Sequence, residues 1–123
     1  KGYAQMFTVM PESEGKVIGL QMIGTVHKED YAALVPKVEA LVQQYDDVRM
    51  LCDLGEFKTE AADAWLADLQ FGREFHSKVS KMAIVGDKHW EAWIAKLAAP
   101  FYAKEVQYFH TADMAAAWNW VKA

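Results

Sequence analysis

The strongest constraint on the fold is a short apolar run, residues 82–85, that ends in Gly86-Asp87 and leads at once into a helix-like segment. The run lacks the alternation of apolar and polar residues that a half-exposed strand shows, so it is typical of a strand buried on both faces. Gly-Asp supplies a turn residue and a good helix cap. A strand that feeds a helix N-terminus is the repeating unit of parallel sheets, so the sequence predicts an α/β fold.

The rest of the chain alternates strand and helix patterns. A hairpin is predicted first, with strands at 6–10 and 16–23 around a turn at 11–15. Pro36 lacks an N–H and lies inside the first helix, so a kink or break is expected there. The order ββαβαβαβα predicts one mixed five-stranded sheet, mostly parallel, with about four helices. The later elements are expected as a helix at 28–45, a strand at 48–54, a helix at 60–78, a strand at 81–85, a helix at 88–99, a strand at 105–109 and a last helix.

Composition narrows the class of protein. A chain of 123 residues is the size of one domain, so a single domain over 1–123 is expected. The net charge of −4 leaves no basic face for phosphates, which argues against nucleic-acid binding. Cys52 is the one cysteine, so no internal disulfide can form, and a cytoplasmic location is expected. No apolar run approaches the roughly 20 residues that cross a bilayer, so no membrane span is expected.

A first candidate site lies where the parallel strands end. Ligands of open α/β sheets bind beyond the carboxyl ends of the strands, where helix N-termini offer free N–H groups. Gly24-Thr25 is expected at this rim, and a buried Asp53 would need a partner there, either a helix N-terminus or a ligand. Asp87 and Thr111 have a structural alternative as helix N-caps. The rim candidates are Asp53, Gly55, Gly86, Asp87, His110 and Thr111.

A second candidate site comes from aromatic residues on two predicted helices. In the helix at 60–78 the spacing groups Ala61, Trp65, Leu69 and Gly72 on one face, with Ala64, Phe71 and Phe75 well around from it. That second face needs a partner, which could be another helix, a twin subunit in a homodimer, or an apolar ligand. The alternative is ordinary core packing. The pocket candidates on the two helices are Trp65, Phe71, Phe75, Trp90, Trp93 and Phe101.

The sequence contains few patterns that indicate a metal site or a catalytic site. No two of the four histidines have the i, i+4 spacing of a helical metal site. Cys52 lies in a predicted buried strand, where an inert thiol is expected. The chain has no P-loop, nucleophile elbow or dinucleotide-binding glycine triplet. No metal, cofactor or catalytic residue is therefore predicted, and an enzyme using Asp53, Asp87 and His110 ranks third among the function classes.

Several segments resemble the SpoIIAA-like family of the STAS and CRAL-TRIO fold group. Its most specific motif here is Val85-Gly86-Asp87 with Trp90 and Trp93, and residues 50–55 resemble the Asp-Leu motif that closes the third strand of STAS domains. Further matches are Tyr31, Leu34-Val35-Pro36, Val106-Gln107-Tyr108-Phe109 and Ala117-Trp118.

The resemblance implies a non-catalytic binding or regulatory module. Anti-sigma-factor antagonists of this group are switched by phosphorylation of a serine in a loop whose counterpart here is residues 57–61, where Thr59 is the only hydroxyl and also suits a helix N-cap. The CRAL-TRIO relatives bind lipids or other apolar molecules. The leading expectation is thus an apolar or amphipathic small ligand, and the alternative is a protein-interaction regulator without the phosphoserine loop.

Overall fold

The computed structural model of the chain describes residues 5–87 and 103–123. Five strands form one sheet in the order β1-β2-β3-β4-β5, in which β1 is antiparallel to β2 and the other neighbours are parallel. The predicted α/β class, the hairpin start and the strand order are confirmed, while the helix expected at 88–99 lies outside the described residues. The elements are β1 (Phe7–Val9), β2 (Val17–Val26), α1 (Lys28–Tyr45), β3 (Val48–Glu60), α2 (Ala64–Phe75), β4 (Val79–Val85), β5 (Glu105–Phe109), the short 3-10 helix η1 (Thr111–Asp113) and α4 (Met114–Lys122).

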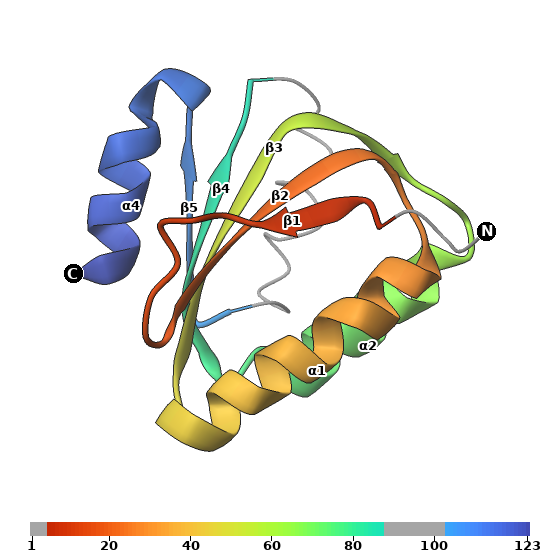
Figure 1. Cartoon of the computed structure of the whole chain (residues 1–123), viewed down its shortest axis with the longest axis horizontal. Coiled ribbons are helices and arrows are strands. Elements are labelled where there is room, and N and C mark those ends of the chain that lie inside the picture. The colour runs from red at the N-terminus through yellow and green to blue at the C-terminus, as the bar shows by residue number, and fades with distance from the viewer. Residues whose placement is uncertain (1–4, 88–102) are drawn as a thin grey trace.

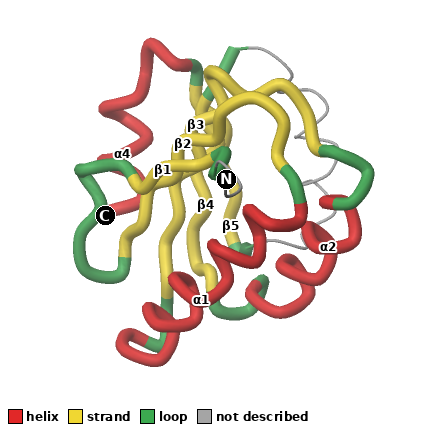
Figure 2. Tube along the Cα trace, turned by 45° about the vertical axis from the view of Figure 1, so that its right-hand side comes forward, coloured by secondary structure: helices red, strands yellow, loops and turns green. Residues whose placement is uncertain are grey.

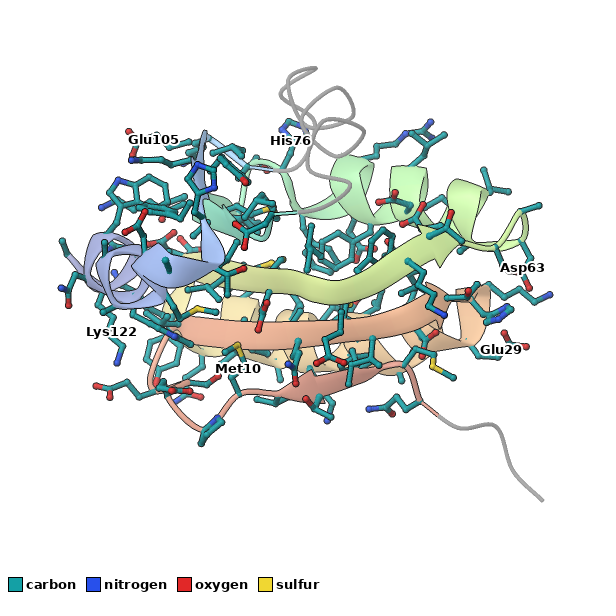
Figure 3. The ribbon with its side chains drawn as sticks, turned by 90° about the horizontal axis from the view of Figure 1, so that it is seen from above. Met10, Glu29, Asp63, His76, Glu105 and Lys122 are labelled. Carbon is teal, nitrogen blue, oxygen red and sulfur yellow. The ribbon has the colours of Figure 1, made fainter. Side chains whose placement is uncertain are left out.

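The sheet is covered on both faces. Helices α1 and α2 lie side by side on one face, and α4 lies on the other (Figure 1). Figure 2 shows the same layering from the side, with the sheet between α4 and the helix pair. Glu29 and Asp63 stand at the same end of the molecule, so α1 and α2 run in the same direction (Figure 3). The result is a three-layer arrangement whose middle layer is largely excluded from water.

The larger core lies between the helix pair and the sheet. Alternate residues of the strands point into it, because successive side chains of a strand face opposite sides. From α1 it receives Tyr31, Leu34 and Val38, all buried. The sheet contributes chiefly Leu20, Met22, Met50, Cys52, Leu54, Met82 and Ile84.

The smaller core lies under α4. Ala117, Trp118 and Val121 pack on the opposite face of the strands. Trp118 lies so close to β2 that a Cβ added at Gly19 would stand 2.4 Å from its Cη2 atom. The complementary residues of the sheet are Val17, Leu51, Ala83 and Val85. The run 82–85 is therefore buried on both faces, as its lack of alternation predicts.

The faces of α2 are the reverse of those expected. Phe71 and Phe75 are 5 % and 3 % exposed and pack into the larger core, whereas Leu69 is 54 % exposed and Leu66 is 65 % exposed. The buried face of α2 includes Ala64 and also Asp68. Because a carboxylate lies in the middle of this face, the sequence pattern does not identify the face as buried. The interpretation of Phe71 and Phe75 as a second, separate face is wrong.

Two other local expectations are also wrong. α1 runs unbroken through Pro36. The N–H that proline lacks would have bonded the carbonyl of Ala32, and Ala32 is an exposed residue. The buried side chains of Leu34 and Val38 anchor the helix on either side of Pro36. β3 does not stop at Leu54 but continues to Glu60, since the far end of β2 pairs with it.

The extension of β3 changes the role of Thr59. This residue pairs with Thr25 of β2 and is exposed on the strand, so the interpretation of Thr59 as a helix cap is wrong. Helix α2 begins only at Ala64, after Asp63. By contrast, α1 ends as expected at Asp46, which adopts the left-handed conformation with φ of 59°.

Burial on both sides of β4 predicts a large effect of truncating Ile84. Ile84 is 1 % exposed, and Ile84→Ala should lower the free energy of unfolding by about 2–5 kcal/mol because it leaves a cavity in the larger core. The matched control is Ile23→Ala, since Ile23 is in β2 but 38 % exposed; it should cost less than about 1 kcal/mol. Urea denaturation measures both, and equal losses would contradict the placement of β4.

The contact between Gly19 and Trp118 gives a second stability prediction. Gly19→Ala should cost about 1–3 kcal/mol, because the added methyl group overlaps the indole ring. Gly86→Ala is the control, since a Cβ there meets its nearest atom at an ordinary 3.4 Å. The second change Trp118→Leu should recover part of the loss in the Gly19→Ala protein. Stability that stays low in the double variant would show that the indole is not the cause.

Candidate functional site

The first candidate site is the rim formed by the ends of β4 and β5. The Oδ1 atom of Asp87 accepts a hydrogen bond from the backbone N–H of Thr111 at 3.1 Å and lies 3.2 Å from Nδ1 of His110. Tyr108 donates its hydroxyl hydrogen bond to the carbonyl of Gly86, and its oxygen lies 3.4 Å from the same His110 nitrogen. Four of the six residues predicted at the rim are thus joined in one hydrogen-bonded group.

These contacts change the acidity of two groups. The pKa of Asp87 is lowered, mainly by the Thr111 N–H and further by the hydrogen bonds from the side chains of His110 and Thr111. The pKa of Tyr108 is raised by partial burial and by the nearby Asp87 charge. Asp87 therefore stays ionised and, from beyond the end of β4, accepts the Thr111 N–H at the start of η1, the short helix that leads into α4. The helix that Asp87 itself was expected to cap lies outside the described residues.

Asp53 and Gly55 stand beside this group but inside a strand. Asp53 is 8 % exposed, and its Oδ1 accepts a hydrogen bond from the N–H of Gly55 at 3.0 Å, so its predicted need for a partner is met by its own strand. A Cβ at Gly55 would lie 4.0 Å from Oγ1 of Thr111, which places the two residues together. Gly24-Thr25 pairs with the extended end of β3, past the ends of β4 and β5. It therefore lies farther along the sheet than the other rim candidates, and the predicted rim is not one continuous edge.

The rim does not form a metal site within the described residues. Nowhere in 5–87 and 103–123 do three His, Cys, Asp or Glu side chains gather closely enough to hold an ion. The hydrogen bonds above are all intramolecular, and capping explains the residue types. The rim thus offers an ionised carboxylate and an exposed imidazole.

The second candidate site is a cavity inside the larger core. It has a volume of about 40 Å³ and lies between β2, β3 and β4 on one side and the two helices on the other. Apolar groups form nearly all of its wall, with Asp68 as the one carboxylate among its lining residues. The wall comprises Met22, Tyr31, Leu34, Met50, Cys52, Leu54, Asp68, Phe71, Met82 and Ile84.

An open groove of about 520 Å³ runs over the surface between α1 and α2. Tyr31 and Phe71 line both this groove and the inner cavity, so their rings, 6.1 Å apart between centroids, form the partition between the two spaces. The hydroxyl of Tyr31 donates a hydrogen bond to Oε2 of Glu60 at 2.6 Å, which fixes its ring against the end of β3. The other residues of the groove are Lys28, Glu29, Ala32, Val35, Pro36, Ala67, Gln70 and Glu74.

Cys52 is the thiol in the cavity wall. Burial, together with the negative charges of Asp68 and Asp53, raises its pKa to about 12. The thiol is therefore protonated near neutral pH, and a protonated thiol is neither a nucleophile nor a metal ligand. The expectation of an inert core thiol agrees with this environment.

The cavity includes only part of the predicted pocket. Phe71 lines the cavity. The ring centroids of Phe75 and Phe71 are 4.8 Å apart in the core, but Phe75 does not line the cavity. Trp90, Trp93 and Phe101 lie outside the described residues, as does the side chain of Trp65. Sequence reasoning missed Tyr31 and Asp68 as pocket residues. The signal for Asp68 was present, because a single acid between Ala64 and Phe71 on one helical stripe is typical of a buried polar group.

The sequence profile described as SpoIIAA-like matches residues 17–122. The chain belongs to the SpoIIAA-like family. The match covers β2 through α4 and so includes both candidate sites.

A similar solved structure supports the fold of this SpoIIAA-like protein. It is the crystal structure of an uncharacterized protein of the DUF3478 family, with a SpoIIAA-like fold, from Shewanella loihica PV-4. The two chains are 20 % identical, 98 % of each is covered, and the TM-score is 0.77. At that identity the likeness establishes the fold alone. No curated protein matches the chain.

Across the described ranges, none of the helices combines the length and the apolar character needed to cross a bilayer.

The lowered pKa of Asp87 predicts a pH-dependent contribution to stability. The ordinary value is 3.8 and the folded value lies below it, so the ionised carboxylate stabilises the folded protein above 3.8, and this stabilisation is lost as the pH falls through the folded pKa. Asp87→Asn should therefore be less stable than the parent protein at neutral pH, with a difference that shrinks in acid. Urea denaturation across that range measures it.

The variant His110→Gln tests which partner of Asp87, the Thr111 N–H or the His110 side chain, causes most of the pH dependence. Because the Thr111 N–H is the largest cause of the shift, this variant should keep most of the pH dependence. Complete loss of the dependence in His110→Gln would contradict the capping role of Asp87.

Proposed function

We propose that this SpoIIAA-like protein is a non-catalytic, cytoplasmic binding module for an apolar or amphipathic small molecule. The ligand enters by the groove between α1 and α2 and inserts its apolar part into the cavity inside the core. The observation that supports this most directly is that Tyr31 and Phe71 line both spaces. The groove and the cavity therefore share these two side chains as a common wall.

The cavity is small as it stands, but its wall can adapt. Met22, Met50 and Met82 come from three neighbouring strands and line it together. Methionine is unbranched and flexible, so it repacks around guests of different shape at low cost. The proposal therefore expects a slim ligand portion, such as an alkyl chain, in the core.

The absence of catalysis is part of the proposal. It is supported by the protonated state of the Cys52 thiol in the cavity wall. It is also supported at the rim, where Asp87 is engaged by the Thr111 N–H and by His110, and Asp53 by Gly55. Acid–base catalysis needs such groups to face a bound substrate.

A protein-interaction regulator is the second candidate. It is favoured by Leu66 and Leu69, which are 65 % and 54 % exposed on the outer side of α2, where a twin subunit or another protein would bury them. Native mass spectrometry of freshly purified protein discriminates between the two candidates. A retained small-molecule mass supports the binding module, and a dimer or a protein complex without it supports the regulator.

The ligand pocket predicts a specific response to hexanol, used as an apolar probe. Hexanol should shift the methyl NMR signals of Met22, Met50 and Met82, because these line the cavity. The signals of Met10 and Met114, which pack in the smaller core under α4, should stay in place.

Two phenylalanine variants test the entry route. Phe71→Leu removes ring atoms from the partition and should tighten hexanol binding about fourfold, since roughly one more methylene can be buried. Phe75→Leu is the matched control, because Phe75 is equally buried on the same helix but outside both walls. Each should cost about 1–2 kcal/mol of stability. The same change in hexanol affinity for both variants would contradict the pocket.

A further inference from the structure

We infer that the ligand of this pocket is a cationic amphiphile, an alkyl or arylalkyl ammonium whose chain enters the cavity while its charged head stays in the groove between α1 and α2. This inference rests on the proposed function and names the chemical class of its ligand. It is carried by the charges along the route from the groove to the cavity, together with the two aromatic rings at the partition.

The groove carries more negative than positive groups. Among the described residues that line it, Glu29 and Glu74 are acidic and Lys28 is basic. Glu39 of α1 adds a further carboxylate, because it is hydrogen-bonded to Glu74 of α2. Burial, the hydrogen bond to Glu39 and the charge of Glu39 raise the pKa of Glu74. A cation placed beside this pair favours the ionised form of both carboxyl groups and is attracted by their charge.

The inner wall continues the same charge. Asp68, 2 % exposed, stands in the cavity wall. Glu60, 9 % exposed, accepts the hydrogen bond from Tyr31 at the partition. Both are bonded within the protein, but their charges act at a distance because a water-poor interior screens weakly. An anionic head group would thus meet more negative than positive groups along this route, whereas an ammonium would be attracted.

The partition itself suits an ammonium group. Tyr31 and Phe71 present aromatic rings to the groove, and the face of such a ring attracts a cation within about 6 Å of its centroid. Val35 and Ala67 provide apolar surface beside them. A cation held at the rings points its alkyl chain toward the methionine-lined cavity, so one molecule satisfies both the acidic groove and the apolar interior.

Three six-carbon probes that differ only in their head group test the inference: hexylamine, hexanol and hexanoate, titrated at neutral pH and followed by the methyl signals of Met22, Met50 and Met82. Hexylamine should bind about fivefold more tightly than hexanol, which is the effect of one partly screened charge interaction. Hexanoate should bind more weakly than either.

Glu74→Gln identifies the group responsible. It should weaken hexylamine binding about threefold, since one of several carboxylates is neutralised, and leave hexanol binding unchanged. Glu12→Gln is the matched control with the same change of charge, because Glu12 is exposed in the turn between β1 and β2 and does not line the groove. It should leave the affinity for all three probes unchanged.

The outcomes separate the two levels of the proposal. If hexanol or hexanoate binds as tightly as hexylamine, or if Glu12→Gln weakens hexylamine as much as Glu74→Gln does, the cationic class is wrong and the pocket stands. If none of the three probes shifts the cavity methionines, both the cationic class and the proposed function are wrong.

Discussion

The parallel pairing of β3 with β4 is the interaction on which the rest of the structure depends. Cys52 pairs with Ile84 and Asp53 with Val85, and the residues on both faces of these strands are buried. These two strands are shielded from water only if both faces of the sheet are covered, so helices are needed on both sides of the sheet. The helix pair meets this need on one face, and α4 meets it on the other.

The two covers differ in fit, and this difference decides where a ligand could bind. Under α4 the contact is close, since Trp118 occupies the space that a side chain at Gly19 would need. Under α1 and α2 the contact leaves a cavity of about 40 Å³. Flexible methionines from three strands line this cavity. Tyr31 and Phe71 line both the cavity and the surface groove.

The rim and the groove show two uses of carboxylates in one small domain. At the rim, Asp87 has a structural role, because it accepts the Thr111 N–H and so holds η1 to the end of β4. In the groove, burial and the neighbouring Glu39 raise the pKa of Glu74. Ionisable groups with perturbed pKa values cluster at functional sites, which is consistent with the binding role proposed for Glu74.

The sequence by itself determined the local elements. The unalternating run at 82–85, the helix at 28–45 with its end at Asp46, and the strand at 105–109 could all be predicted, because periodicity and turn residues act over a few neighbours. Four of the six rim candidates lie together after the ends of β4 and β5, since the ends of parallel strands meet at one edge.

Only the tertiary structure decided which face of α2 is buried and how far β3 extends. Phe71 rather than Leu69 faces the sheet, because Asp68 can be buried among apolar neighbours once the surrounding protein satisfies it, and a helical pattern alone does not show that. β3 reaches Glu60 because a distant segment, the end of β2, supplies its hydrogen-bond partners. The cavity behind Tyr31 and Phe71 has the same origin, since it is the space that helices from separate parts of the chain leave when they pack on one sheet.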